Sequence, residues 1–299
     1  MAVAAEDGAS ITNGQRFFGG AGGALRPLLP ATLFYAVFFF VPMLCLLVLS
    51  FWQAQGFNLV PDFTFANYQR IATSALYQTL ILRTVVVGLS TACVVVPLAF
   101  VLSYLMRFVL ERRGQIILQL VLLSLFSGYL VRIYAWRTIL GRQGLLNSAL
   151  EWLGFIDEPL QFLIYSNFAV VVTLVGLLLP LALLPIYSSM ANVSRDYLEV
   201  ARDLGSRRVH LVRTVLLPMT LPGVGAAFAF SFLLAAGDFV TPALVGGTRS
   251  IMIGNVIADQ FRGVGANWPL GAALAFVMIV IVMLIYVAVM RVLRWVTRW

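Results

Sequence analysis

The stretch from Tyr197 to Pro218, Y-L-E-V-A-R-D-L-G-S-R-R-V-H-L-V-R-T-V-L-L-P, lies between two long apolar segments of the chain. It is rich in arginine, carries acidic residues as well, and holds the only histidine of the sequence. Charged side chains are costly in hydrocarbon, so this stretch is expected to lie outside the bilayer. The apolar segments on either side of it are therefore predicted to be membrane spans, and the stretch itself a connection between them.

Composition indicates an integral membrane protein. Of 299 residues, 61% are hydrophobic and 11% are charged, with a mean hydropathy of +0.96, whereas about 25% of the residues of a soluble domain are charged. Every basic residue is arginine, and the net charge of +8 is spread along the chain. This pattern is typical of membrane topology, and nucleic-acid binding is not expected. Cys45 and Cys93 lie in apolar runs without metal-ligand spacing.

Six segments are long and apolar enough to cross about 30 Å of hydrocarbon, which takes roughly 20 helical residues. They cover, approximately, residues 28–52, 79–106, 115–139, 163–190, 219–240 and 269–290. The first is too long for the apolar region of a signal peptide and is kept as a span. Prolines within the spans (Pro42, Pro97, Pro180 and Pro185) predict kinks. The expected fold class is all-α, a polytopic membrane protein with six transmembrane helices.

The arginines set the expected orientation, because basic residues are retained on the cytoplasmic side. With a cytoplasmic N-terminus most arginines fall in inside connections, which places both termini and the Tyr197–Pro218 stretch in the cytoplasm. Residues 1–27 are expected to be a flexible cytoplasmic tail, and residues 28–299 the transmembrane domain. No soluble domain of about 50 residues or more is left, so the energy for any transport must come from a partner or an ion gradient.

The first half of the charged stretch predicts a short amphipathic helix. Ser194 is a good helix cap, and Gly205 can provide the left-handed stop. The apolar stripe between them consists of Tyr197, Leu198, Ala201 and Leu204. A helix of this kind fits the groove of a partner protein.

The second half predicts another helix. Ser206 can cap it, and it is expected to run through Arg207–Leu216. The pairs Leu217-Pro218 and Leu221-Pro222 are expected to end it and lead into the next span.

These residues also carry a family resemblance. The spacing Glu199-Val200-Ala201, three residues, Gly205, nine residues, Val215-Leu216-Leu217-Pro218 resembles the cytoplasmic E-A-A, x3, G, x9, I-x-L-P loop of permease subunits of ATP-binding-cassette (ABC) importers. Val200 and Val215 are mild departures. The resemblance implies that the loop at about 194–217 is a coupling helix that docks on a cytoplasmic ATPase. The coupling residues that it implies are Glu199, Ala201, Asp203, Gly205, Ser206, Arg207 and Arg208.

Four further strings look like the spermidine/putrescine permease group, over roughly residues 70–290. They are Tyr129–Arg137, Gly144–Asn147, Gly237–Pro242 and Met252–Asn255. The resemblance implies a type I ABC importer permease fold in a bacterial inner membrane, without a catalytic site or cofactor of its own, since ATP and Mg²⁺ are used by the ATPase. The implied partners are two ATPase copies, a second related permease subunit and an extracytoplasmic solute-binding protein, with lipid around the spans. The sequence does not separate a heterodimer from a homodimer.

Asp238 is the first candidate for the substrate pathway. It ends the fifth span between Gly237 and Pro242, which favour a broken helix that lines a cavity. With Phe239 beside it, the carboxylate can attract an ammonium group by charge and cation–π contact. Two structural roles remain open beside this one: Asp238 can cap a re-entrant turn, or it can pair with Arg132 or Arg137.

Tyr129, Tyr134 and Trp136 form a second candidate, an aromatic cluster that either belongs to the interfacial belt or lines the pathway. Arg132 and Arg137 near it would repel a polycation unless they are neutralised. An anionic substrate therefore stays open.

Several alternatives remain at this stage. The same architecture can import another small solute, such as an amino acid, an opine or a phosphonate. An ion-gradient carrier predicts an inverted repeat with matching broken helices, and one broken segment is visible. A membrane enzyme would have to recruit His210, which also lacks a second metal ligand, and a chain without lysine has no P-loop. Finally, the charged stretch can be a connection that only orients two spans. Our preferred interpretation is a permease subunit for a small polar solute of the polyamine type.

Overall fold

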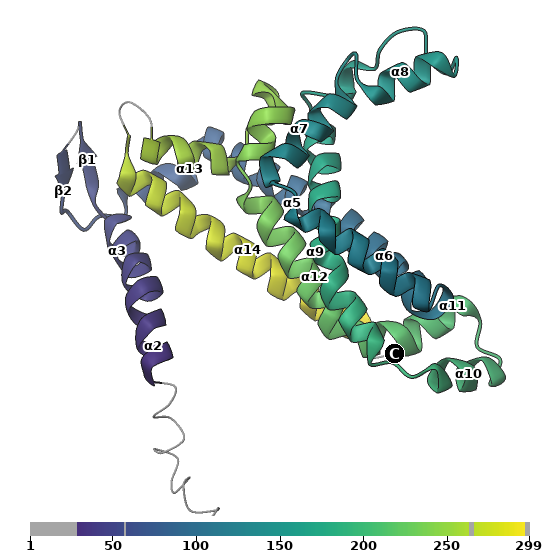
Figure 1. Ribbon diagram of the computed structural model, residues 1–299. Helices are drawn as coiled ribbons and strands as arrows, with labels where there is room; N and C mark the ends of the chain where they lie inside the picture. Colours follow the sequence, from purple (N-terminus) through teal and green to yellow (C-terminus); the bar gives the residue numbers. More distant parts are fainter. Residues whose placement is uncertain (1–28, 57, 263–265, 297–299) are drawn as a thin grey trace, which may run out of the picture. The chain divides into compact units, whose positions relative to one another are not determined.

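The computed structural model describes residues 29–56, 58–262 and 266–296 (Figure 1). The tail predicted for residues 1–27 lies outside these residues. The chain divides into two compact units, Met1–Leu49 and Ser50–Trp299, and each is described by itself.

The described part of the first unit is one apolar helix with a π-helical turn inside it. It consists of α2 (Leu29–Tyr35), η2 (Ala36–Phe40) and α3 (Val41–Leu49). The N–H of Val41 donates to the carbonyl of Ala36, five residues back. Pro42, which has no N–H to donate, follows directly. The stretch Pro30–Leu49 is long and apolar enough to cross a membrane, as predicted.

The second unit begins with a short antiparallel hairpin, β1 (Gln53–Gln55) and β2 (Asn58–Val60), in which Gln53 pairs with Val60. The side chain of Asn67, in α4 (Ala66–Thr73), donates to the carbonyls of Ser50 at 2.9 Å and Trp52 at 2.8 Å. These two bonds hold the start of the hairpin. The all-α expectation therefore holds for the spans, and the hairpin is a small addition to it.

Three long helices pack against one another in the second unit: α5 (Ala75–Tyr104), α9 (Asn167–Ala191) and α12 (Leu217–Gly237). Small residues permit the close approach. A Cβ on Gly223 of α12 would collide with the carbonyl of Pro185 in α9, and one on Gly88 of α5 would lie 3.1 Å from the ring of Phe232 in α12. A fourth long helix, α14 (Trp268–Val296), packs on α12 and on α13 (Ile253–Arg262). These helices confirm four predicted spans.

The third predicted span, 115–139, is not one straight helix. The chain forms α6 (Arg112–Leu123) with a 3-10 turn, η4 (Ser124–Phe126), then breaks and starts again as α7 (Tyr129–Leu140). Arg112–Phe126 and Tyr129–Trp152 meet at 101°. Ser127 and Gly128 both have extended backbone, with ψ of 134° and 137°, which a helix does not allow. Among the described residues, five helices can span a membrane, or six if the bent pair is one span.

The remaining elements connect these helices. α5 ends in a π-helical turn, η3 (Leu105–Val109). After α7 come α8 (Leu145–Trp152) and a 3-10 turn, η5 (Gln161–Leu163). Between α12 and α13 lie a π-helical turn, η7 (Pro242–Gly246), and a 3-10 turn, η8 (Thr248–Ser250).

Candidate functional site

The charged connection between α9 and α12 folds into α10 (Arg195–Asp203), α11 (Arg208–Leu211) and a π-helical turn, η6 (Val212–Leu216). The predicted cap of α10 is confirmed, because the hydroxyl of Ser194 accepts the N–H of Asp196 at 3.3 Å. The same hydroxyl donates to the Asp196 carboxylate at 3.0 Å. The start of α10 is thus fixed by its own residues.

The end of α10 is a Schellman motif. Gly205 has φ +78°, its N–H donates to the carbonyl of Arg202 at 2.8 Å, and the N–H of Ser206 donates to the carbonyl of Ala201 at 3.0 Å. A left-handed residue at this position favours glycine. The predicted left-handed stop at Gly205 is therefore confirmed.

The second predicted helix does not end at its prolines. Residues Val209–Gly237 form one continuous helical span, which passes through Pro218 and Pro222. The N–H of Leu217 donates to Val212, five residues back, directly before Pro218. The π-helical turn accommodates the missing N–H of the proline, in the same way as the turn before Pro42. The predicted boundary at 217–222 was wrong for this reason.

The predicted apolar stripe of α10 is divided between two faces. Leu198 and Ala201 are 3% and 9% exposed and pack with Leu211 and Leu216 in a small core at the end of α5. Tyr197, Val200 and Leu204 are 56%, 57% and 82% exposed. We call Tyr197, Val200 and Leu204 the outer row. One face of α10 thus fastens the helix to the span, while the outer row is left uncovered.

An ion pair ties α10 to the connection between η3 and α6. Arg195 Nη2 lies 2.9 Å from Glu111 Oε1, and this is the only ion pair among the described residues. Glu199 was expected to contact a partner or to pair with Arg195 or Arg202; neither of these two ion pairs is formed. Of the other implied coupling residues, Asp203, Gly205 and Arg207 are exposed, whereas Ser206 is half-buried. Arg208 begins α11.

At the far end of α12, Asp238 caps the broken segment. The helix ends at Gly237, and Asp238 has extended backbone with ψ 122°. Its Oδ1 accepts the N–H groups of Val240 at 2.8 Å and Thr241 at 3.2 Å. Its Oδ2 accepts the hydroxyl of Tyr129 at 2.6 Å and that of Thr241. The predicted break is confirmed, and the contacts are those of the predicted capping role.

Neither arginine near this site pairs with Asp238. Arg132 Nη1 donates to the carbonyl of Leu177 at 3.3 Å, and Arg137 Nη2 donates to the hydroxyl of Tyr165 at 3.5 Å. In the described part of the chain no acidic oxygen lies within 4.0 Å of either guanidinium. The ion-pair alternative for Asp238 was therefore wrong.

A cavity of about 450 Å³ opens beside Asp238 between α7, α9 and α12. Leucines of α9 and α12 make most of its wall. Its polar lining comes from Tyr129, Arg132 and Asp238, with Phe239 beside them. Arg132 Nε is buried, and no described residue accepts a hydrogen bond from it. In the sequence, Arg132 was considered as an ion-pair partner of Asp238 and as a charge that would repel a polycation; its place in the cavity wall beside Asp238 follows from the fold.

The predicted aromatic cluster does not converge on this cavity. Tyr129 lines the cavity. Tyr134 does not, and its side chain is 51% exposed. Trp136 packs so closely on α9 that a Cβ on Gly176 would collide with its indole. Phe239 already has a cation of the protein over its ring, because the Arg262 guanidinium carbon lies 5.4 Å from the ring centroid.

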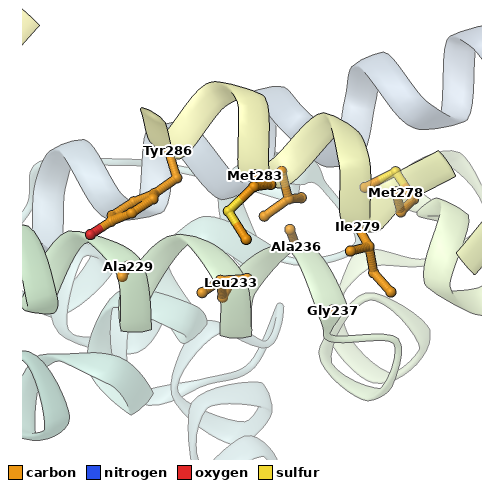
Figure 2. A pocket seen from close by; sticks show the side chains of 9 residues that line it. Ala229, Leu233, Ala236, Gly237, Met278, Ile279, Met283 and Tyr286 are labelled. Carbon is orange, nitrogen blue, oxygen red and sulfur yellow. The ribbon is translucent and has the colours of Figure 1, made fainter. Parts of the chain in front are cut away.

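A second, apolar groove of about 350 Å³ lies between α12 and α14. Figure 2 shows Met283 and Ile279 of α14 above the small residue Ala236 and Leu233 of α12, with Tyr286 at one end. It holds no charged side chain. The sequence did not indicate this groove, because it results from how two apolar helices diverge.

Known proteins resemble this chain in sequence. The profile of a family described as "Binding-protein-dependent transport system inner membrane component" matches residues 71–299. The spermidine/putrescine transport system permease protein PotB of Salmonella typhimurium (strain SL1344) is 31% identical over 262 residues, covering 86% of this chain and 90% of the relative. PotB of Haemophilus influenzae is 32% identical over 259 residues, covering 85% and 89%.

A solved structure shows the same fold. It is the crystal structure of a bacterial ABC transporter involved in the import of the acidic polysaccharide alginate. One of its chains aligns with a TM-score of 0.73 at 16% identity, over 92% of this chain and 96% of that chain.

Proposed function

Since the chain belongs to the family of binding-protein-dependent transport system inner membrane components, we propose that it forms half of the pathway by which an ABC importer takes up a polyamine of the spermidine/putrescine type. It is a transport permease subunit with the type I importer fold. The observation that carries the proposal is the family match over residues 71–299, which contains both the capped loop and the cavity beside Asp238.

We propose that the connection between α9 and α12, which contains α10 and its Ser194 cap, is the docking site of the ATPase. The outer row (Tyr197, Val200 and Leu204) is apolar and exposed, and Glu199, Asp203 and Arg207 border it with charge. An apolar row with a charged border suits a groove in a partner protein. In this proposal two copies of a cytoplasmic ATPase bind α10 and its counterpart on a second, related permease subunit. The ATPase copies hydrolyse the ATP. Both termini of this chain lie on the same, cytoplasmic side of the membrane.

The cavity beside Asp238 is proposed to belong to the pathway, with Tyr129 and Phe239 in its wall. All four hydrogen bonds of the Asp238 carboxylate are made inside the protein, so its role is to hold the wall in shape. An extracytoplasmic solute-binding protein, which the family description implies, is proposed to deliver the polyamine. Selection of the solute then rests largely on that protein.

One observation favours a second solute class. Arg132 lines the cavity, and its buried Nε has no acceptor among the described residues. A phosphonate or carboxylate oxygen would satisfy it. A small amino acid or aminophosphonate is therefore the alternative solute.

Transport by the reconstituted complex tests both readings. The permease pair, the ATPase and the binding protein are placed in liposomes, and uptake of labelled putrescine and of labelled 2-aminoethylphosphonate is measured with and without ATP. ATP-dependent uptake of putrescine supports the proposal, and uptake of the phosphonate alone supports the alternative. Uptake that proceeds without the ATPase, driven by an ion gradient, would overturn both.

A further inference from the structure

A second polar cavity lies at the opposite end of α9 from the coupling loop. It has a volume of about 500 Å³ and is lined by Arg142, Gln161, Ile164, Tyr165, Gly247, Thr248 and Arg249. These residues come from the connection α7–α8, from η5 and the connection that follows it to α9, and from Gly247 and the start of η8. We propose that this cavity binds an acidic side chain of the extracytoplasmic solute-binding protein, an inference that rests on the proposed function.

The position of the cavity follows from one helix. Tyr165 lies just before α9, and α10 begins a few residues after its other end. A helix of 25 residues is about 37 Å long, which is enough to cross the hydrocarbon of a membrane. Figure 1 shows α7 and α8 at one end of α9 and α10 at the other. If the loop faces the ATPase, the cavity faces the opposite side, where the binding protein delivers its solute.

The charge of the cavity is positive and uncompensated. Arg142 and Arg249 are both exposed, and neither has an acidic oxygen within 4.0 Å among the residues that the structure describes. The hydroxyl oxygen of Tyr165 accepts from Arg137 Nη2 at 3.5 Å, so its own proton is free to be donated. Two guanidiniums and a hydroxyl donor form a site for a carboxylate, which arginine binds with two parallel hydrogen bonds.

The floor of the cavity is held rigidly. Tyr165 has φ +56°, which is strained for a residue with a side chain, and its N–H donates to the carbonyl of Val245 at 2.8 Å. Gly247 has φ +66°, and a Cβ there would lie 3.0 Å from the Cβ of Tyr165. The turn at Tyr165 and the turn at Gly247 therefore pack closely and are joined by a hydrogen bond, which restricts the movement of both. Strain of this kind is a feature of preorganised sites, and a fixed site loses less entropy when it binds.

The composition also fits a protein partner. Arginine and tyrosine are enriched among residues that dominate the energy of protein interfaces. Phe162, which follows Gln161 in the chain, is 55% exposed, so an apolar side chain is also available next to a residue of the cavity lining. A carboxylate on the binding protein, surrounded by apolar contact, would be drawn in by charge and held by these side chains.

The test measures how the complex responds to its binding protein. The complete importer is placed in nanodiscs, and the concentration of solute-loaded binding protein that half-maximally stimulates ATP hydrolysis is determined. In the double variant Arg142→Glu/Arg249→Glu this concentration is expected to rise about tenfold or more. The matched control is Arg70→Glu, which reverses an exposed arginine of α4 outside the cavity and should change it less than about twofold. Elution of each variant as the intact complex shows that it assembles.

Three results would overturn the inference. The first is a double variant that responds like the wild type. The second is an effect seen only in nanodiscs with phosphatidylglycerol and lost in phosphatidylcholine, because the cavity would then bind lipid phosphate. The third is a wild-type complex whose ATP hydrolysis no binding protein stimulates. This result would also contradict the proposal that a solute-binding protein delivers the polyamine. A charge swap gives the positive counterpart: replacing the responsible acidic residue of the binding protein by arginine should restore stimulation of the double variant.

Discussion

Gly205→Val should uncouple ATP hydrolysis from uptake. Gly205 has φ +78°, and a Cβ built there meets nothing within 4 Å. Steric collision is therefore not part of the cost, which comes from the backbone alone. A non-glycine residue in the left-handed region costs about 1–3 kcal/mol, and a β-branched side chain belongs at the upper end. At about 2 kcal/mol, the equilibrium of the Schellman turn shifts roughly 30-fold toward other conformations.

The substitution is expected to change the angle between α10 and α11 without unfolding α10. The N–H groups of Gly205 and Ser206 would lose their acceptors on Arg202 and Ala201. The start of α10 would still be held by the Ser194 cap and by the buried side chain of Leu198. The outer row would then stay helical but no longer lie at a fixed angle to α11. A movement of the ATPase would then produce a smaller movement of the membrane-spanning helices.

The assay is the number of solute molecules imported per ATP hydrolysed in liposomes. Two matched variants isolate the cause. Gly205→Asn should keep most of the coupling, because asparagine tolerates a left-handed backbone. Gly154→Val imposes the same strain at φ +73°, also with nothing within 4 Å, but outside the coupling loop. Wild-type coupling in Gly205→Val, or an equal loss in Gly154→Val, would refute the reasoning.

Three further predictions follow from single contacts. Asp238→Asn should keep more than about half of wild-type uptake, because the amide oxygen can still accept the two backbone N–H groups, whereas Asp238→Ala should lose most of it in the same uptake assay. Thr84→Val should destabilise the purified complex by about 1–3 kcal/mol, measured by thermal unfolding, because it strands the buried N–H of Ile253; Thr91→Val, a buried threonine with a hydrogen bond inside its own helix, is the milder control. Arg195→Ala removes an exposed ion pair and should change stability by less than about 1 kcal/mol in the same measurement.

The sequence predicted well those features that depend on neighbouring residues. The spans follow from apolar length, and the loop follows from the capping chemistry of Ser194 and the left-handed preference of Gly205. Both signals are local, so no knowledge of the fold was needed. The break at Asp238 was predicted for the same reason, from Gly237 and Pro242 on either side of it.

The errors came where local signals were overruled or were too weak. Pro218 reads as a helix end, but a π-helical turn before it lets the helix continue. The break at Ser127 has no proline and reads as part of one apolar span. Partners far apart in the chain were also out of reach. Tyr129 and Asp238 are separated by 109 positions, and the pattern around each says nothing of the hydrogen bond between them.

That hydrogen bond limits how the cavity can change shape during transport. It joins α7 to the end of α12, and a hydrogen bond to a charged group is worth about 1.5–3 kcal/mol. A motion that separated Tyr129 from Asp238 would lose this energy and leave a carboxylate oxygen with one donor fewer, unless a donor of the solute replaced it. The inexpensive motion keeps both together, so α7 and the turn after α12 should move as one wall against α9. Alternating access would then open the cavity along its leucine-lined side, where α7 gives up the hydrogen bond from Arg132 to the carbonyl of Leu177 in α9, which is longer, at 3.3 Å, and has an uncharged acceptor.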